Sequence, residues 1–259
     1  MSNRIFIVVF AVTTIAISIC CTNALEAQVI TDGLVSFWTF DRADVDGDTV
    51  KDVFGNNDGI MEGGDIVDDG KIHAAIELDG ASFVDCGTDE SLNLTDALTI
   101  ELWMKPASVG EGGINAGPAC KAVSGGSWAW QLRYNAPGGF MGFQFNANPG
   151  GSTWISVQEN LEPEEWYHIT GTFDGSDLVC YLDGVETERI SASAINSSSD
   201  NFFIGQDGWV NCFDGLVDEV RVYDRALSEA EIQNNYITTS QLAVEPAEKL
   251  AITWGAVKR

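Results

Sequence analysis

Basic residues are scarce in this chain of 259 residues. Lysine and arginine together number 13, against 39 aspartates and glutamates, and the formal net charge is −26. A phosphate backbone would be repelled by such a chain, which excludes nucleic-acid binding by general electrostatics. The same repulsion argues against binding to an anionic membrane surface. Aspartates in turn-like stretches can bind a hard cation, or they can simply favour turns and keep the protein soluble.

Common catalytic and zinc-binding motifs are also missing. The two histidines, His73 and His168, lie far apart, and the sequence has no Cys-x-x-Cys, no His-Glu-x-x-His and no phosphate loop. Glucanases use a Glu-x-Asp-x-x-Glu strand, but the nearest run, residues 77–82, lacks the final glutamate. On a regular strand the neighbours Asp218 and Glu219 would point to opposite faces. We therefore predict a protein that is not an enzyme, with a polysaccharide hydrolase as the less favoured alternative.

A continuous apolar run occurs at the N-terminus, over residues 5–19. It is short for a membrane span and typical of the central region of a signal peptide. We predict a signal peptide over residues 1–24, with cleavage after Ala24 or, alternatively, Ala27. A lipoprotein anchor at Cys20 or Cys21 is less favoured, because the residues before them are not small. The mature protein is expected to be secreted, extracellular or at the cell surface, with the periplasm as an alternative.

The remaining cysteines fall into two kinds of segment. Cys86 and Cys180 lie in apolar strand patterns and are expected to be small buried residues. Cys120 and Cys212 lie in glycine-rich, loop-like stretches. An exported protein can form disulfides, and sequence alone does not fix the pairing. Among the possible pairings we favour Cys120 with Cys212.

Apolar and polar residues alternate with a period of two along most of the chain, between turns rich in glycine, aspartate and asparagine. Ser228 and Glu231 form a capping box that predicts one helix of about two turns. The pattern predicts an all-β fold, a two-layer antiparallel β-sandwich (jelly roll) with one short C-terminal helix. We expect one domain over residues 29–236. Residues 237–259 form a tail that is either a last strand or a partly ordered appendage.

Several segments also occur in a characteristic order. They are residues 34–41 (LVSFWTFD), 97–106 with TIELW at its centre, 166–175 with WYH and FDG, and 213–227 with DEV and YDRAL. Together they resemble the laminin-G-like jelly-roll domains of the concanavalin A-like lectin/glucanase superfamily. The resemblance implies the sandwich fold. It implies less about the ligand, because this superfamily includes lectins, adhesion modules and glucanases.

The resemblance further implies a structural calcium ion at one edge of the sandwich. In this sequence the matching positions are Asp41, Asp58 and Asp218, with a backbone carbonyl near Gly80 as a further ligand. A second candidate is an aspartate-rich loop that departs from the EF-hand pattern, with Thr49 in place of its glycine. Its carboxylates are Asp44, Asp46, Asp48 and Asp52. Against both stands the simpler interpretation that these aspartates occupy solvated turns.

Strand alternation suggests a recognition face. If the central strands pair in one sheet, one face carries polar groups around an aromatic ring, the arrangement that stacks on sugars and hydrogen-bonds them. That set is Glu101, Trp103, Gln131, Arg133, Gln144 and His168, and Trp209 in a nearby loop is a further candidate. The alternative is a polar sheet face that only meets water, with His168 a structural residue. We predict a module that binds carbohydrate or glycoprotein, with a structural or adhesion domain as the alternative.

Overall fold

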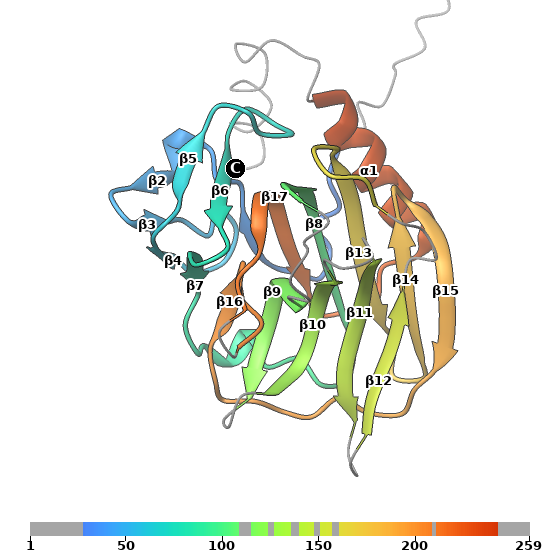
Figure 1. Ribbon diagram of the computed structural model, residues 1–259. Helices are drawn as coiled ribbons and strands as arrows, with labels where there is room; N and C mark the ends of the chain where they lie inside the picture. Colours follow the sequence, from blue (N-terminus) through green and yellow to red (C-terminus); the bar gives the residue numbers. More distant parts are fainter. Residues whose placement is uncertain are drawn as a thin grey trace, which may run out of the picture.

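The computed structural model describes residues 28–108, 115–123, 127–135, 140–147, 151–156, 161–208 and 211–242. Within them, two antiparallel sheets stack as layers, and one helix lies near the C-terminus (Figure 1). The predicted two-layer sandwich is confirmed. The signal peptide, Trp209 and most of the predicted tail lie outside the described residues.

Sheet A has the strand order β15-β14-β13-β8-β17-β6-β5, with β1 also paired to β17. Its strands are β1 (Leu34–Trp38), β5 (Asp65–Val67), β6 (Ala75–Asp79), β8 (Leu98–Pro106), β13 (Tyr167–Phe173), β14 (Asp177–Leu182), β15 (Val185–Ser191) and β17 (Asp214–Tyr223). The first and last strands of the sandwich are neighbours, with Phe37 opposite Arg221 and Trp38 opposite Val220. This pairing places the two ends of the sandwich side by side.

Sheet B has the strand order β12-β11-β10-β9-β16-β7-β4-β3-β2. Its strands are β2 (Val45–Asp46), β3 (Thr49–Val50), β4 (Gly59–Glu62), β7 (Phe83–Asp85), β9 (Asn115–Val123), β10 (Ser127–Asn135), β11 (Phe140–Ala147), β12 (Gly151–Ser156) and β16 (Phe202–Ile204). Two 3-10 turns, η1 (Arg42–Asp44) and η2 (Glu90–Leu92), complete the connections.

The core lies between the sheets and follows the alternation seen in the sequence. On β8, the alternate residues Leu98, Ile100, Leu102 and Met104 are fully buried in the core. Each large apolar side chain buried in this way contributes roughly 1.5–3 kcal/mol. The residues between them, among them Glu101 and Trp103, therefore face the outer side of sheet A.

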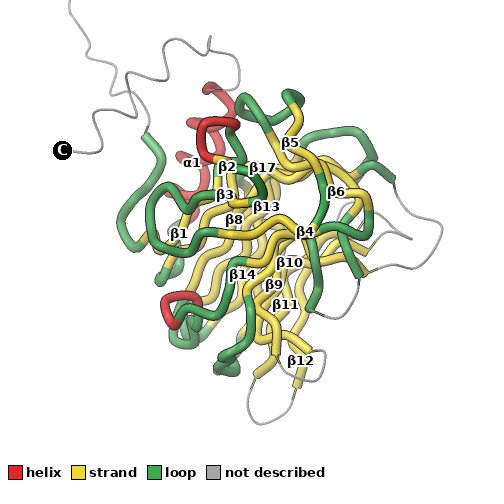
Figure 2. The backbone as a smooth tube through the Cα atoms, turned by 90° about the vertical axis from the view of Figure 1, so that its left-hand side faces the viewer, coloured by secondary structure: helices red, strands yellow, loops and turns green. Residues whose placement is uncertain are grey.

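Helix α1 (Glu229–Leu242) covers part of that outer side, and Figure 2 shows it beside one of the two layers. The predicted capping box is confirmed: the Ser228 amide donates to the Glu231 carboxylate at 2.8 Å. The helix has 14 residues, so the prediction of two turns was too short. The start of the predicted tail, residues 237–242, belongs to it. No helix in the described part of the chain is long and apolar enough to span a membrane.

Candidate functional site

The predicted recognition residues lie on two different sheets. Glu101 and Trp103 on β8 and His168 on β13 belong to sheet A, whereas Gln131 and Arg133 on β10 belong to sheet B. Gln144 on β11 is also in sheet B, where it pairs with Gln131. The expectation that all these strands share one sheet was wrong. Alternation assigns each residue to an inner or outer side, but it does not assign a strand to a layer.

Beneath α1, the sheet A residues form a buried polar network. Glu101 and His168 are inaccessible to solvent, and their closest side-chain atoms, Oε2 and Nε2, are 3.8 Å apart. The other carboxylate oxygen of Glu101 accepts hydrogen bonds from Asn235 Nδ2 at 2.8 Å and the Tyr223 hydroxyl at 3.2 Å. Arg221 lies 3.5 Å from it and also pairs with Glu219. The network fastens the helix to the sheet.

His168 is held neutral in this network. Burial lowers its pKa to about 3, and the positive charges of Arg221 and Lys71 add to the shift. Burial also raises the pKa of the Glu101 carboxyl, and the positive charge of Arg221 opposes that shift. An uncharged, solvent-inaccessible imidazole fits the structural interpretation of His168.

Trp103 is also enclosed. It is 2% exposed, and its ring stacks on Tyr236 of α1 with centroids 5.6 Å apart. The His168 ring packs against the Trp103 ring with centroids 5.1 Å apart, and the Lys71 ammonium lies 4.1 Å from the Trp103 ring centroid. The ring therefore anchors the helix and the residue 68–74 loop, and it is not open for stacking on a sugar.

The outer side of sheet B carries the other part of the predicted set. Arg133 is half-buried, between the core residues Leu132 and Tyr134. Burial lowers the pKa of its guanidinium, and the nearby Asp207 carboxylate opposes that shift. Gln131, two residues earlier, points to the same side and is 1% exposed.

Asp207 and Asn211 extend this polar group, and the sequence analysis missed both. The Asn211 side chain donates to Asp207 Oδ2 at 2.6 Å, and its backbone amide donates to Oδ1 at 3.2 Å. Gly117 on β9 permits the approach, because a Cβ there would lie 3.0 Å from the Asp207 Cα. The available signal was the loop around Trp209, rich in glycine, asparagine and aspartate. We name Gln131, Arg133, Asp207 and Asn211 the sheet B polar cluster.

Two of the three predicted calcium ligands come together. Asp41 Oδ1 accepts from the Ala74 amide at 3.3 Å, and Asp218 Oδ2 accepts from the Ile72 amide at 2.8 Å. Burial raises the pKa of both carboxyls, and that of Asp218 is raised further by Glu219 and Asp41. Asp218 Oδ1 is buried with no hydrogen-bond partner among the described residues. A cation at this edge would compensate two repelling carboxylates.

The predicted set of three carboxylates does not form. Asp58 is exposed and accepts a hydrogen bond from the Asp52 amide at 2.9 Å. Among the described residues, no group of three acidic, cysteine or histidine side chains is arranged to hold a metal ion. The alternative aspartate loop also fails, because Asp52 turns inward and accepts from the Phe37 and Gly55 amides at 2.9 and 2.8 Å.

A β-bulge changes the relation between Asp218 and Glu219. Glu219 has φ +56°, and the pairing of β17 with β8 shifts between Asp218 and Arg221. Val217 and Val220 on either side both face the core. The two acids therefore lie on the same, outer side of sheet A, and the prediction that they point to opposite faces was wrong. Both are buried, at 0% and 2% exposure.

The predicted Cys120–Cys212 disulfide is not present. The structure holds Cys86, Cys120, Cys180 and Cys212 as buried thiols. Burial raises the pKa of the Cys86 and Cys120 thiols well above the ordinary value. Cys120 lies on the paired strand β9, not in a loop, so the glycine-rich context was misleading.

Comparison with known families identifies the group to which this sandwich belongs. The model of the concanavalin A-like lectin/glucanases superfamily, Laminin_G_3, matches residues 78–233. The chain belongs to this superfamily. The superfamily match runs from the end of β6 through β17 to the first residues of α1, and so contains the sheet B polar cluster and Asp218. A search of curated proteins found no match.

Three solved structures serve as examples of a similar fold. The binding domain of Paraclostridial mosquitocidal protein 1 has a TM-score of 0.63 and 22% identity, covering 79% of this chain and 52% of that one. Domain 4 of the arabinanase AbnA from Geobacillus stearothermophilus, in complex with arabinotriose, has a TM-score of 0.61 and 23% identity, covering 78% of this chain and 98% of that one. Trypanosoma rangeli sialidase has a TM-score of 0.62 and 17% identity, covering 84% of this chain and 34% of that one. The chain thus spans about half of the first and a third of the last.

Proposed function

We propose that this protein is a non-catalytic recognition module that binds carbohydrate on the outer side of sheet B. The observation that carries the proposal is the sheet B polar cluster, in which a half-buried arginine lies near a carboxylate fixed by Asn211. Sugars are recognised by such rigid combinations of donors and acceptors. The superfamily includes lectins, and domain 4 of AbnA was solved with arabinotriose.

The outer side of sheet A is the less suitable surface. Helix α1 covers Glu101, Trp103 and His168, each 2% exposed or less. A sugar would have to displace Tyr236 from Trp103 and Asn235 from Glu101 before it made any contact there. We therefore place the ligand over Arg133 and not over Trp103.

Arabinotriose and a panel of soluble polysaccharides are the probes that test this site, by calorimetry and affinity electrophoresis. Arg133→Ala should weaken binding of whichever glycan binds the unmodified protein at least about tenfold, since it removes a charge-assisted donor. Arg42→Ala is the matched control, because Arg42 is an exposed arginine paired with Asp68 at 2.6 Å. Equal affinities for the two variants would contradict the site. Binding of no glycan, with assembly onto a protein partner, would favour the adhesion alternative.

The module is also proposed to carry a structural calcium ion held by Asp41 and Asp218. The unpartnered, buried Asp218 oxygen supports this assignment. Calcium takes six to eight oxygen ligands, so backbone carbonyls of the adjoining loop would complete the set. The ion would join the end of β1 to β17 and contribute rigidity, not chemistry.

Export is the remaining part of the proposal. The N-terminal sequence of the protein recovered from the medium or periplasm tests it. A mature N-terminus after Ala24 or Ala27 is expected from the signal-peptide pattern. A lipid-modified Cys20 or Cys21 would instead establish the lipoprotein route.

A further inference from the structure

A concave site lies on the outer side of sheet A, beside the start of α1. It has a volume of about 350 Å³, within the range of small-ligand sites. Its floor is Thr172 of β13 with Val179 and Tyr181 of β14. Its walls are β15 on one side and residues 226–229, which lead into α1, on the other. We name it the α1 groove.

The floor of the α1 groove combines apolar surface with one phenol. Val179, Tyr181 and Leu227 are each 3% exposed, so they are fixed by packing against the sheet and helix. The Tyr181 hydroxyl is hydrogen-bonded with Thr172. The groove therefore offers a path for an alkyl arm that ends beside a polar oxygen.

Negative charge is in excess around this groove. Four carboxylates line it, from Asp174, Glu186, Glu229 and Glu231, with the single guanidinium of Arg189 among the lining residues. Two of the four are paired, Glu186 with Arg189 and Glu231 with Arg225, each at 2.7 Å. Among the described residues, Asp174 and Glu229 are in no ion pair, although Arg189 also acts on Asp174 and lowers the pKa of its carboxyl.

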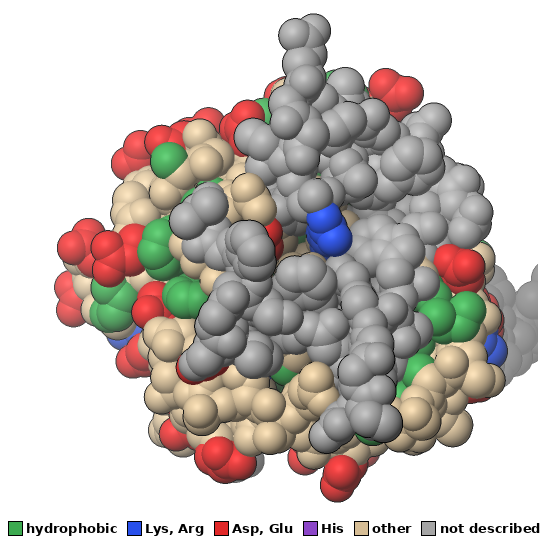
Figure 3. Space-filling model, turned by 60° about the horizontal axis from the view of Figure 1, so that its bottom comes forward, with side chains coloured by type: hydrophobic (Ala, Val, Ile, Leu, Met, Phe, Trp, Pro, Cys, Tyr) green, Lys and Arg blue, Asp and Glu red, His purple; other side chains and the backbone are tan. Residues whose placement is uncertain are grey.

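The two remaining carboxylates differ in their surroundings. Asp174 accepts from Ser176 and Asp177 within its turn but keeps its charge. Glu229 is exposed and lines the groove with Tyr181. Burial raises the pKa of the Tyr181 phenol, Glu186 and Glu229 add to that shift, and Arg189 opposes it. The end of the groove near Tyr181 is thus suited to a cation. The rest of the molecule is acidic too, and acidic side chains outnumber basic ones on the face in Figure 3.

We propose that the α1 groove binds a lysine side chain presented by a partner protein. The alkyl arm would lie along Val179 and Leu227, and the ammonium would meet the Glu229 carboxylate and the Tyr181 oxygen. The charge of −26 would draw a basic partner toward this surface. This site is separate from the sheet B polar cluster and does not depend on sugar binding.

Nα-acetyl-lysine methylamide is the probe, titrated into the ¹⁵N-labelled protein and followed by NMR. Backbone signals of the groove residues should shift, and the norleucine analogue, with the same arm but no charge, should leave them unchanged. Glu229→Gln should weaken binding about fivefold or more, since it removes a charge-assisted contact. Tyr181→Phe keeps the ring and should weaken binding less.

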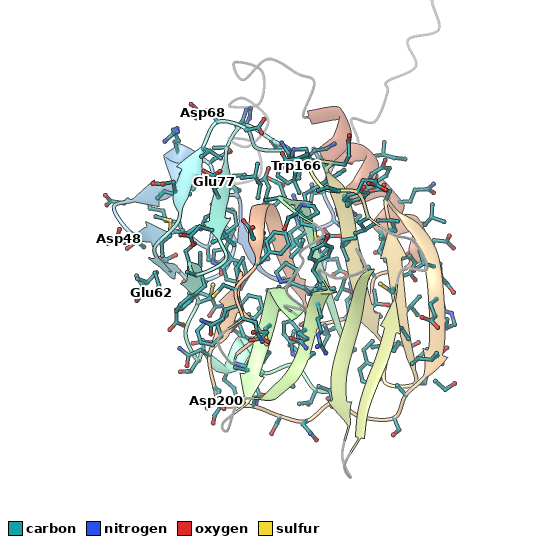
Figure 4. The ribbon with its side chains drawn as sticks, viewed as in Figure 1. Asp48, Glu62, Asp68, Glu77, Trp166 and Asp200 are labelled. Carbon is teal, nitrogen blue, oxygen red and sulfur yellow. The ribbon has the colours of Figure 1, made fainter. Side chains whose placement is uncertain are left out.

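Glu62→Gln is the matched control, because Glu62 lies on the lobe opposite β15 and α1 (Figure 4). It removes the same charge and should leave the affinity unchanged. If Glu62→Gln and Glu229→Gln weaken probe binding equally, the binding is due to the overall negative charge, and the proposed site is overturned. Equal shifts with the norleucine analogue would overturn the role of the ammonium. Tighter binding of 1,5-diaminopentane would assign the groove to free polyamines and overturn the protein partner.

Discussion

Asn235 of helix α1 donates its side-chain amide to the buried Glu101 carboxylate of β8 across 2.8 Å. The same amide lies 3.0 Å from the Tyr223 hydroxyl, and the Asn235 oxygen accepts from the Ile30 amide at 2.8 Å. One side chain therefore joins the helix, the sheet and the segment before β1.

Replacing Asn235 with alanine should destabilise the fold by about 1–3 kcal/mol, because Glu101 and Tyr223 lose a buried partner. Asn234→Ala is the matched control, since the neighbouring amide donates to the Gln28 carbonyl in an exposed position. Urea unfolding of the two variants measures the difference. Equal midpoints would contradict the anchoring role.

The contribution of His168 to the stability of the protein should be lost as pH decreases from about 6.5 to about 3. His168 is neutral in the folded state down to the lower value, whereas the unfolded chain binds a proton below the upper one. The unfolded state is then favoured by up to about 1.4 kcal/mol per pH unit. His168→Gln should make the pH dependence of the unfolding free energy shallower. Equal slopes for wild type and His168→Gln would contradict the assignment.

Trp103→Ala should lower the free energy of unfolding. Removing a ring that is 2% exposed leaves a cavity between sheet A and α1, at a cost of about 3–5 kcal/mol. Trp166→Ala, at a half-buried position in the loop before β13, should cost less. Thermal unfolding followed by circular dichroism compares them. A Trp103→Ala protein with an unchanged midpoint that has lost glycan binding would restore the sheet A face as the ligand site.

The fold could be predicted from the sequence because the alternation in strands such as β8 distinguishes core residues from outer residues without any tertiary information. The capping box at Ser228 fixed the start of α1 for the same local reason. The end of the helix was not readable, because Tyr236 and Asn235 are held by contacts with Trp103 and Glu101. Those partners are more than 130 residues away in the sequence.

The candidate site was only partly readable. Arg133 and His168 have the same alternating pattern, yet one lies over sheet B and the other beneath a helix. What separates them is the order of strands in each layer, which depends on long-range pairing. Arg221 lies between Val220 and Val222, and an arginine in an apolar strand requires a buried partner. This pattern could have predicted the buried polar network, but it was not used.

Calcium should raise the thermal midpoint of the unmodified protein, and a chelator should reverse the effect, because an ion bound only by the folded state stabilises it. Asp218→Asn distinguishes the effect of the ion on stability from the effect of the buried charge. It removes a buried charge that Asp41 and Glu219 repel, so the variant should be more stable than wild type in chelator. It also removes a ligand charge, so its midpoint should respond little to calcium.

Asp58→Asn should retain the full calcium response, because Asp58 is exposed and bonded to the Asp52 amide. In chelator the thermal midpoint of Asp218→Asn should lie above that of wild type, and in calcium it should lie below. This reversal distinguishes a bound ion from a general salt effect. Magnesium at equal concentration is the further control, because it demands octahedral geometry and gives up its water reluctantly. A wild-type midpoint that ignores calcium would leave the Asp41–Asp218 repulsion as an uncompensated cost of the fold and would refute the site.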